Sequence, residues 1–171
     1  MSNMWITSMT PTEELIVYLA NNFPNQNLTQ LVMHKLLYFV DKSALQKLGR
    51  RITTGPYKAN KWGPTHNHLN AIEHDLAAWV NVLRKGSKTY YVGLNNRQGY
   101  SFDKEELAVI DEVIKKYKNA KTDVIIEDSH DEYWEELYKK GQAYQYTKYD
   151  SPIIDVDVLS GILKSANNKK Q

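Results

Sequence analysis

The feature that most constrains the fold is an apolar stripe through residues 28–48, where apolar side chains recur every four residues. Its members are Leu28, Val32, Leu36, Val40, Ala44 and Leu48, and the neighbouring Leu31, Phe39 and Leu45 widen it. Such spacing indicates one face of an α-helix. Gly49 follows as a natural C-terminal stop. The pattern predicts a long helix that begins near residues 28–29, ends at residue 48 and forms the central core element.

Three further helices are predicted from start signals that precede apolar residues at helical spacing. Thr10 followed by Pro11 predicts a helix over residues 11–22, because threonine caps helix N-termini and proline suits the first turn. Thr65 predicts a helix that runs to about residue 82. Asp103, followed by two glutamates, predicts a helix that ends near residue 117.

The remaining segments predict a small amount of extended chain and further helix. Residues 52–54 and 57–62 flank a Gly-Pro turn, and residues 88–92 form a strand whose expected partner is residues 99–102. A helix begins at Thr122, and the capping-box pattern of Ser129 and Glu132 favours a new helix there, stopped by Gly141. Residues 144–149 are expected to be extended, and residues 156–163 to form a last short helix.

Together these elements predict an α+β fold that is mainly α. We expect a single domain over residues 1–163 with a core of about five or six helices and a small antiparallel β-sheet or hairpin. Residues 164–171 are expected to form a polar C-terminal tail.

Composition excludes several classes of protein. The chain has 171 residues, 42% of them hydrophobic and 25% charged, which is typical of one globular domain. It has no cysteine, which excludes disulfides, thiolate metal sites and a cysteine nucleophile. The N-terminus lacks a signal-peptide pattern, and the apolar run at residues 76–83 is too short for a membrane span. We therefore expect a cytoplasmic protein with no membrane partner.

Charge is distributed unevenly between the two parts of the chain. Residues 1–100 carry a net charge of +6, and residues 101–171 carry −4. Such a polarity predicts either a charged binding face or attraction between the two parts in the fold. We expect the basic residues around the long helix to meet the acidic helices that follow residue 103, or one of these surfaces to be left open for a partner.

Motifs of known catalytic sites are absent from the sequence, which contains no G-x-S-x-G, H-E-x-x-H, P-loop or dinucleotide-binding glycine pattern. His66, His68 and His74 are not spaced to share a helix face, so solvated or capping roles are favoured over a metal site. His34 is expected to make a partly buried polar contact. Adjacent acids such as Asp131–Glu132 are interpreted as solvated helix faces. We expect no enzymatic activity, catalytic residues, metal or cofactor.

Nucleic-acid binding is the alternative that the basic region raises. Its cations alternate with aromatic side chains, which could neutralise phosphates and stack on bases. The same cations fit the solvated edge of an amphipathic helix, and no helix-turn-helix pattern is evident, so a nucleic-acid partner is not expected. The residues concerned are Lys35, Lys42, Lys47, Arg50, Arg51, Lys58 and Lys61, with Tyr38, Tyr57 and Trp62.

Residues 33–64 carry the most specific pattern in the chain. Lys35-Leu-Leu-Tyr-Phe39 and Asp41 are followed by Ile52-Thr53, Tyr57 and Ala59, and then by Trp62-Gly-Pro64. In this order and spacing the sequence resembles the Panacea domain, the SocA-like antitoxin family that also includes phage-associated proteins. Ser129-His130 followed by Trp134 is similar to a later element of the same family. The resemblance spans about residues 10–162.

The resemblance implies an antitoxin that neutralises a protein toxin by direct binding, the toxin being the product of the adjacent gene. It also implies, as an alternative, an adaptor that delivers the toxin to a Clp-type protease. A phage-encoded inhibitor of a host defence protein and a DNA-binding regulator remain further alternatives.

Six of the signature residues could build a polar and aromatic partner-binding surface, because protein interfaces favour such side chains. They are Lys35, Tyr38, Asp41, Tyr57, Lys61 and Trp62. Others are expected to specify the fold: Leu36, Phe39, Ile52, Gly63, Pro64, Ser129, His130 and Trp134. In the purely structural alternative, Lys35 pairs with an acid, Ser129 and His130 cap a helix, and Trp134 fills the core.

Overall fold

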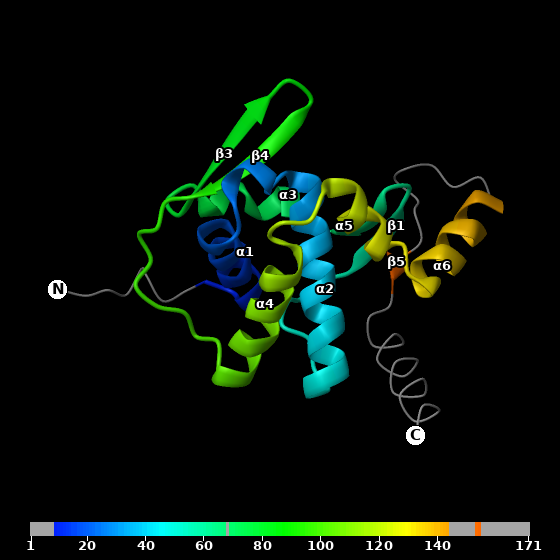
Figure 1. Ribbon diagram of the computed structural model, residues 1–171, viewed down its shortest axis with the longest axis horizontal. Coiled ribbons are helices and arrows are strands. Elements are labelled where there is room, and N and C mark those ends of the chain that lie inside the picture. The colour runs from blue at the N-terminus through cyan, green and yellow to red at the C-terminus, as the bar shows by residue number, and fades with distance from the viewer. Residues whose placement is uncertain (1–8, 68, 144–152, 155–171) are drawn as a thin grey trace.

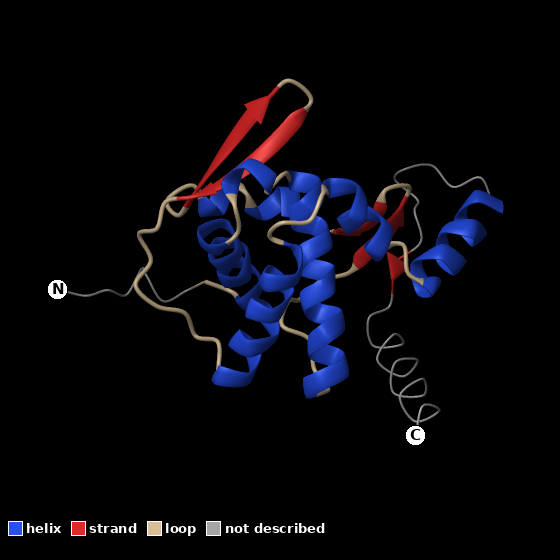
Figure 2. Cartoon of the chain, in the orientation of Figure 1, coloured by secondary structure: helices blue, strands red, loops and turns tan. Residues whose placement is uncertain are grey.

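The computed structural model describes residues 9–67, 69–143 and 153–154, and it is an α+β fold that is mainly α, as predicted (Figures 1 and 2). Its helices are α1 (Pro11–Asn22), α2 (Gln30–Leu48), α3 (Leu69–Ile72), α4 (Lys104–Tyr117), α5 (Thr122–Ser129) and α6 (Glu132–Ala143). Two short 3-10 turns cover Asn25–Asn27 and His74–Leu76. None of the described helices is long and apolar enough to cross a membrane.

Helix α2 is the central element, as its apolar stripe predicts. Thr29 caps it by accepting a hydrogen bond from the backbone N–H of Val32, and Gly49 ends it in the left-handed conformation. The stripe is buried from Leu28 to Ala44 and packs against α1, α4, α5 and the first sheet. Figure 1 shows α2 between α1 and α4 on one side and the β1 region on the other.

Helices α1 and α4 begin where the sequence predicts. Thr10 and Glu13 form a capping box at the start of α1, each side chain bonding the other's backbone N–H. Asp103 and Glu106 do the same at the start of α4. These caps satisfy backbone donors that have no partner within the helix.

The first sheet contains β1 (Tyr57–Asn60), β2 (Gly63–His66) and β5 (Ile153–Ile154), in the order β2-β1-β5. Strands β1 and β2 form an antiparallel hairpin in which Asn60 pairs with Gly63. Strand β5 pairs antiparallel with the other edge of β1. The turn between β1 and β2 is thus Lys61–Trp62, next to the signature Gly63-Pro64.

The second sheet is a hairpin of β3 (Val80–Lys85) and β4 (Lys88–Gly93). The two strands are antiparallel and joined by Gly86-Ser87. Figure 2 shows this hairpin extending outward from the helical body.

The second hairpin corrects two predictions. The helix predicted from Thr65 to residue 82 is wrong, since Thr65 lies in β2, the helix is the single turn α3, and residues 80–82 belong to β3. Residues 99–102 are not the partner of residues 88–92, because β3 takes that place. Leu76, Val80 and Leu83 fit a helical period, but Val80, Val82 and the Gly-Ser turn fit a hairpin better.

Of the remaining predictions, some are confirmed, some are wrong and some concern residues that the structure does not describe. A break between α5 and α6 is confirmed, but the capping residue differs from the expected one, and α6 continues past Gly141 to Ala143. Residues 52–54 are not in a strand. The predicted extended segment at 144–149, the helix at 156–163, the domain boundary at 163 and the tail at 164–171 lie outside the described residues.

Candidate functional site

A buried carboxylate on α2 fixes the loop that leads into β1. Asp41 is fully buried, and its Oδ1 accepts hydrogen bonds from the backbone N–H groups of Ile52 and Thr53 at 2.8 and 2.9 Å. Its Oδ2 accepts from the Tyr57 hydroxyl at 2.7 Å and from the Thr53 hydroxyl, with an Arg51 nitrogen at 3.3 Å. Burial and the Asp41 charge raise the pKa of Tyr57, which keeps it a donor. Residues 51–57 therefore use the hydrogen-bonding capacity of both Asp41 carboxylate oxygens.

A buried cation on the same helix holds the turn between β1 and β2. Lys35 is fully buried, and its Nζ donates to the carbonyl oxygen of Pro64 at 2.8 Å. The predicted pairing of Lys35 with an acid is wrong among the described residues, where no carboxylate lies within ion-pair distance of Nζ. Burial lowers the pKa of Lys35 to about 7, because desolvation disfavours the charged ammonium.

Gly63 lies directly against this cation. Its φ of +105° is unfavourable for other residues, and a Cβ there would overlap Ser129 Oγ and lie 3.0 Å from Lys35 Cε. Ser129 is itself fully buried, and its hydroxyl donates to the carbonyl of Ile126 at 2.6 Å. The signature glycine is therefore required both by backbone conformation and by the close approach of α2 and α5.

Asp131 joins α2 to the start of α6. Its Oδ2 accepts from the Tyr38 hydroxyl at 2.6 Å and from Lys42 Nζ at 2.9 Å, and its Oδ1 accepts from the backbone N–H of Trp134 at 2.8 Å. Asp131, not Ser129, therefore caps α6, which corrects the predicted capping box. The solvated-face interpretation of Asp131 is also wrong, since its side chain is only 13% exposed.

An aromatic stack closes the other side of the turn. His130 lies parallel to Trp134 at 3.9 Å between ring centroids, and Trp134 lies parallel to Tyr138 at 4.9 Å. Trp134 Nε1 donates to the carbonyl of Asn60 at 2.8 Å, and the His130 ring bonds the backbone of Trp62. Burial, together with the nearby Lys35, lowers the pKa of His130. Trp134 thus fills the core next to the turn, as predicted.

The residues predicted to bind a partner fall into two groups. Lys35, Tyr38, Asp41 and Tyr57 are at most 1% exposed, so their side chains support the surface from beneath. Lys61 and Trp62 are exposed at the turn, with Trp62 56% exposed and Lys61 Nζ 5.1 Å from its ring centroid. The residues expected to specify the fold are buried, except for the half-buried His130: Leu36, Phe39, Ile52, Gly63, Pro64, Ser129 and Trp134.

Two residues of this site were missed by sequence reasoning. Asp131 joins α2 to α6 through a bond that spans 93 positions, and Asn60 joins the turn to α6 through one that spans 74. For Asp131 a local signal did exist, because aspartate three residues before an apolar helical residue is a standard N-cap. Nothing local distinguishes Asn60, since only its backbone carbonyl is used by Trp134.

His34 and His66 make structural contacts, so the solvated or capping role favoured for His66 is wrong, whereas His74 is exposed. His66 is buried, its Nε2 lies 2.8 Å from the Thr54 carbonyl oxygen, and its backbone N–H donates to His34 Nδ1. Burial lowers the pKa of His34 to about 3, in line with the predicted partly buried contact. His68 lies outside the described residues. Within those residues, no three potential ligands gather closely enough to hold a metal ion.

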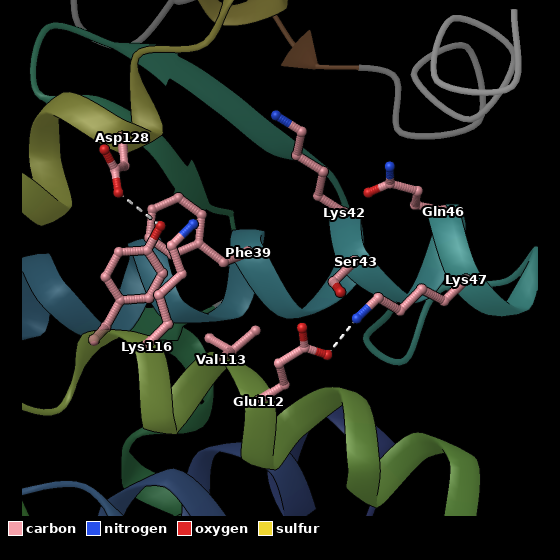
Figure 3. Close-up of a pocket in the computed structure, with 10 residues that line it drawn as sticks. Phe39, Lys42, Ser43, Gln46, Lys47, Glu112, Val113, Lys116 and Asp128 are labelled. Atoms are coloured by element: carbon pink, nitrogen blue, oxygen red, sulfur yellow. Dashed lines mark hydrogen bonds and ion pairs between the residues drawn. The ribbon is translucent and has the colours of Figure 1, made fainter. Parts of the chain in front are cut away.

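The predicted meeting of the two charged parts of the chain is confirmed by ion pairs that join residues 42–50 to residues 103–131. Lys47 pairs with Glu112, Arg50 with Asp103 at 2.8 Å, and Lys42 with Asp131. A groove of about 380 Å³ lies between α2 and α4, and Figure 3 shows Lys47 and Glu112 joined across it. The charges of Lys47 and Glu112 therefore neutralise each other across this groove.

The fold and the buried network define a mainly helical α+β domain built around one charged and apolar helix. Residues 33–135 match the family described as antitoxin SocA-like, Panacea domain. The chain therefore belongs to this family, as the resemblance predicts. The matched region begins in α2 and ends in α6, so it includes the network from Lys35 to Trp134. No curated protein and no solved structure matches the chain.

Proposed function

We propose that this protein is an antitoxin that neutralises a protein toxin by direct binding, with the β1–β2 turn as a central contact. The exposure of Trp62 is the observation that supports this contact. At 56% it is the most exposed of the large hydrophobic side chains among the described residues. Tryptophan is enriched among residues that dominate binding energy at protein interfaces.

The buried network makes this turn a preorganised surface. Lys35 holds the Pro64 carbonyl from α2, and Trp134 holds the Asn60 carbonyl from α6. The turn is therefore fixed on both sides before a partner arrives, which lowers the entropy lost on binding. In this proposal Lys35, Tyr38, Asp41 and Tyr57 are positioning residues, and Lys61 and Trp62 touch the partner.

The mechanism requires no catalytic step. A toxin that offers an apolar pocket for Trp62 and an acidic rim for Lys61 would be occluded by the bound domain, so we propose a non-enzymatic protein that needs no cofactor. The partner proposed is the product of the adjacent gene, in the cytoplasm.

Co-expression of the adjacent gene product with this chain in a bacterial host tests the proposal. We expect the unaltered chain to restore growth and to co-purify with the toxin. Trp62→Ala should weaken the complex by about 30-fold, the effect of losing a strong interface residue. Val124→Ala is the matched control, because Val124 is 45% exposed but lies on α5.

Two outcomes would count against this function. If no complex forms and growth is not restored, the adjacent gene product is not the partner. If a complex forms with equal affinity for Trp62→Ala, the antitoxin role stands and the turn is not the contact. Equal urea midpoints for both variants would show that neither result reflects unfolding.

A further inference from the structure

The outer edge of β3 has backbone groups that the hairpin does not use. Leu94 N–H donates to the Trp79 carbonyl at 3.0 Å, and Val80 pairs with Gly93, so residues 81, 83 and 85 bond β4. In an antiparallel pair the intervening residues direct N–H and C=O the other way. The backbone groups of residues 80, 82 and 84 therefore face the outer edge, where the described residues supply no third strand. Val80 is buried, so residues 82 and 84 are the accessible ones.

The outer edge of β4 differs because the body of the protein covers it. Tyr91 N–H donates to the Leu28 carbonyl at 3.0 Å, and Thr29 forms an isolated bridge with Tyr90. The two edges of one hairpin are thus unequal: one is closed by the start of α2, and the other is open.

A hollow of about 440 Å³ runs beside the open edge. On the strand side it is lined by Val80, Asn81, Val82 and Arg84, and on the helical side by Asn70, Glu73, His74 and Ala77. Glu73 is engaged by the Tyr91 hydroxyl and by Gln30 Nε2, so its charge is partly satisfied within the fold. A further strand would lie about 4.8 Å from β3, and the hollow gives space for it.

The hairpin is also strongly basic. Residues 80–94 contain Arg84, Lys85 and Lys88 and no acidic residue. Leu83 is 42% exposed on the same strand. Leu83 and Lys85 therefore project from one face of β3 and Arg84 from the other, because successive side chains of a strand alternate.

We propose that the open edge of β3 binds an extended acidic segment of a partner polypeptide, which adds to the hairpin as a third strand. Backbone hydrogen bonds to residues 82 and 84 supply binding energy, as in other cases of strand addition. An apolar partner residue lies across from Leu83, and carboxylates lie across from Arg84 and Lys85.

This surface is independent of the one proposed for the toxin. Figure 1 shows the β3–β4 hairpin projecting from the top of the helical body, away from β1 and α6 on the right. A polypeptide is favoured over nucleic acid because unpaired strand groups, a hollow and an exposed leucine all match an extended peptide. Of these features, only the cations would help to bind the phosphates of a nucleic acid.

The test uses the full chain and a nine-residue peptide rich in valine and threonine, with two adjacent central glutamates. Binding is followed by changes in backbone amide NMR signals of β3 on titration. Two control peptides have the glutamates replaced by lysines, or alternate backbone nitrogens methylated. The matched protein variants are Val82→Pro, which removes an outward N–H that the ladder does not use, and Ser87→Ala in the turn.

We expect the glutamate peptide to shift the β3 signals, and the lysine and methylated peptides to bind at least about tenfold more weakly. Val82→Pro should weaken binding similarly, and Ser87→Ala should not. The methylated peptide gives the same answer if Val82→Pro does not fold.

Absence of binding by the glutamate peptide at millimolar concentration would overturn the proposal. Equal binding by the methylated peptide would also overturn it, because attraction would then be purely electrostatic. Titration with a 20-base-pair DNA duplex tests the alternative that this surface binds nucleic acid. Binding of DNA at the hairpin, lost in Arg84→Glu with Lys88→Glu and unmatched by any peptide, would assign the surface to nucleic acid instead.

Discussion

The two hairpins of this molecule are attached to the helices in different ways. The β1–β2 hairpin is held by buried side chains of α2 and α6: Lys35 bonds the Pro64 carbonyl, Asp41 bonds the Tyr57 hydroxyl, and Trp134 bonds the Asn60 carbonyl. The β3–β4 hairpin is held at its base by Tyr91 and by the burial of Val80, while its tip is solvated.

This difference separates two kinds of binding surface. A turn that is fixed by a buried network offers a rigid side chain such as Trp62, and the cost is paid when the domain folds. A hairpin with an open edge offers unused backbone groups, which any strand of suitable charge can pair with. The comparison predicts that changes in the first region destabilise the whole domain, whereas changes at the tip of the second act locally.

The largest effect is expected for Gly63→Ala. The substitution places a Cβ against Ser129 Oγ in a backbone with φ of +105°, so strain and overpacking add to about 3 kcal/mol of lost stability. Urea denaturation measures the loss. Gly49→Ala is the matched control, because Gly49 has φ of +74° with no atom near its Cβ, and we expect about 1 kcal/mol. Equal losses of stability in the two variants would show that the close approach of Gly63 to Ser129 and Lys35 adds no cost.

Asp131→Ala should give the next largest effect. It removes the N-cap of α6 and leaves the buried Tyr38 hydroxyl without its acceptor, which together cost about 2 kcal/mol. Asp123→Ala, at an exposed acid in the first turn of α5, should change stability little. Hydrogen exchange of β3 and β4 amides should rise only as far as global stability falls. A selective rise in the hairpin would contradict the separation of the two regions.

The same contrast shows what the sequence can and cannot specify. Helix starts at Thr10 and Asp103 are predictable, because a cap and its partner lie three residues apart. The stripe of α2 is predictable because its period is local. Its buried Lys35 is not, because the Pro64 carbonyl that receives the ammonium lies 29 positions away.

Strand β3 is not predicted from the sequence, whereas β4 is, and the reason is related. Residues 76–83 satisfy a helical period, and the register that makes residues 80–85 a strand depends on pairing with residues 88–93. The exposed Trp62 is identifiable as part of the family signature. That it is exposed while Tyr57 is buried follows from the alternation of β1 and from the position of Trp62 in the turn.

The pH dependence of stability tests whether the cation of the first region is truly desolvated. The folded pKa of Lys35 is about 7, whereas an unfolded lysine keeps its proton to about pH 10.4. Between these values the unfolded chain binds more protons, so stability should rise with pH, by up to about 1.4 kcal/mol per unit. His34, with a folded pKa of about 3, contributes only below about pH 6.5.

Lys35→Met should flatten this rise between pH 7 and 9, as measured by urea denaturation at several pH values. Lys42→Met is the control, because Lys42 pairs with Asp131 at a partly exposed position, and this variant should keep the slope. A slope that persists in Lys35→Met would assign the pH dependence to other groups. The pKa of Lys35 would then not be lowered by burial.

The smallest effect is expected for Gly86→Ala at the tip of the second hairpin. Gly86 has φ of +60° with no atom near its Cβ, so the substitution costs about 1 kcal/mol of local backbone strain. Since the tip is solvated, this cost should appear as about fivefold faster exchange of the β3 and β4 amides, with little change in the urea midpoint. If Gly86→Ala instead lowers the midpoint as much as Gly63→Ala does, the hairpin unfolds together with the core. The open edge of β3 would then be as rigid as the Trp62 turn.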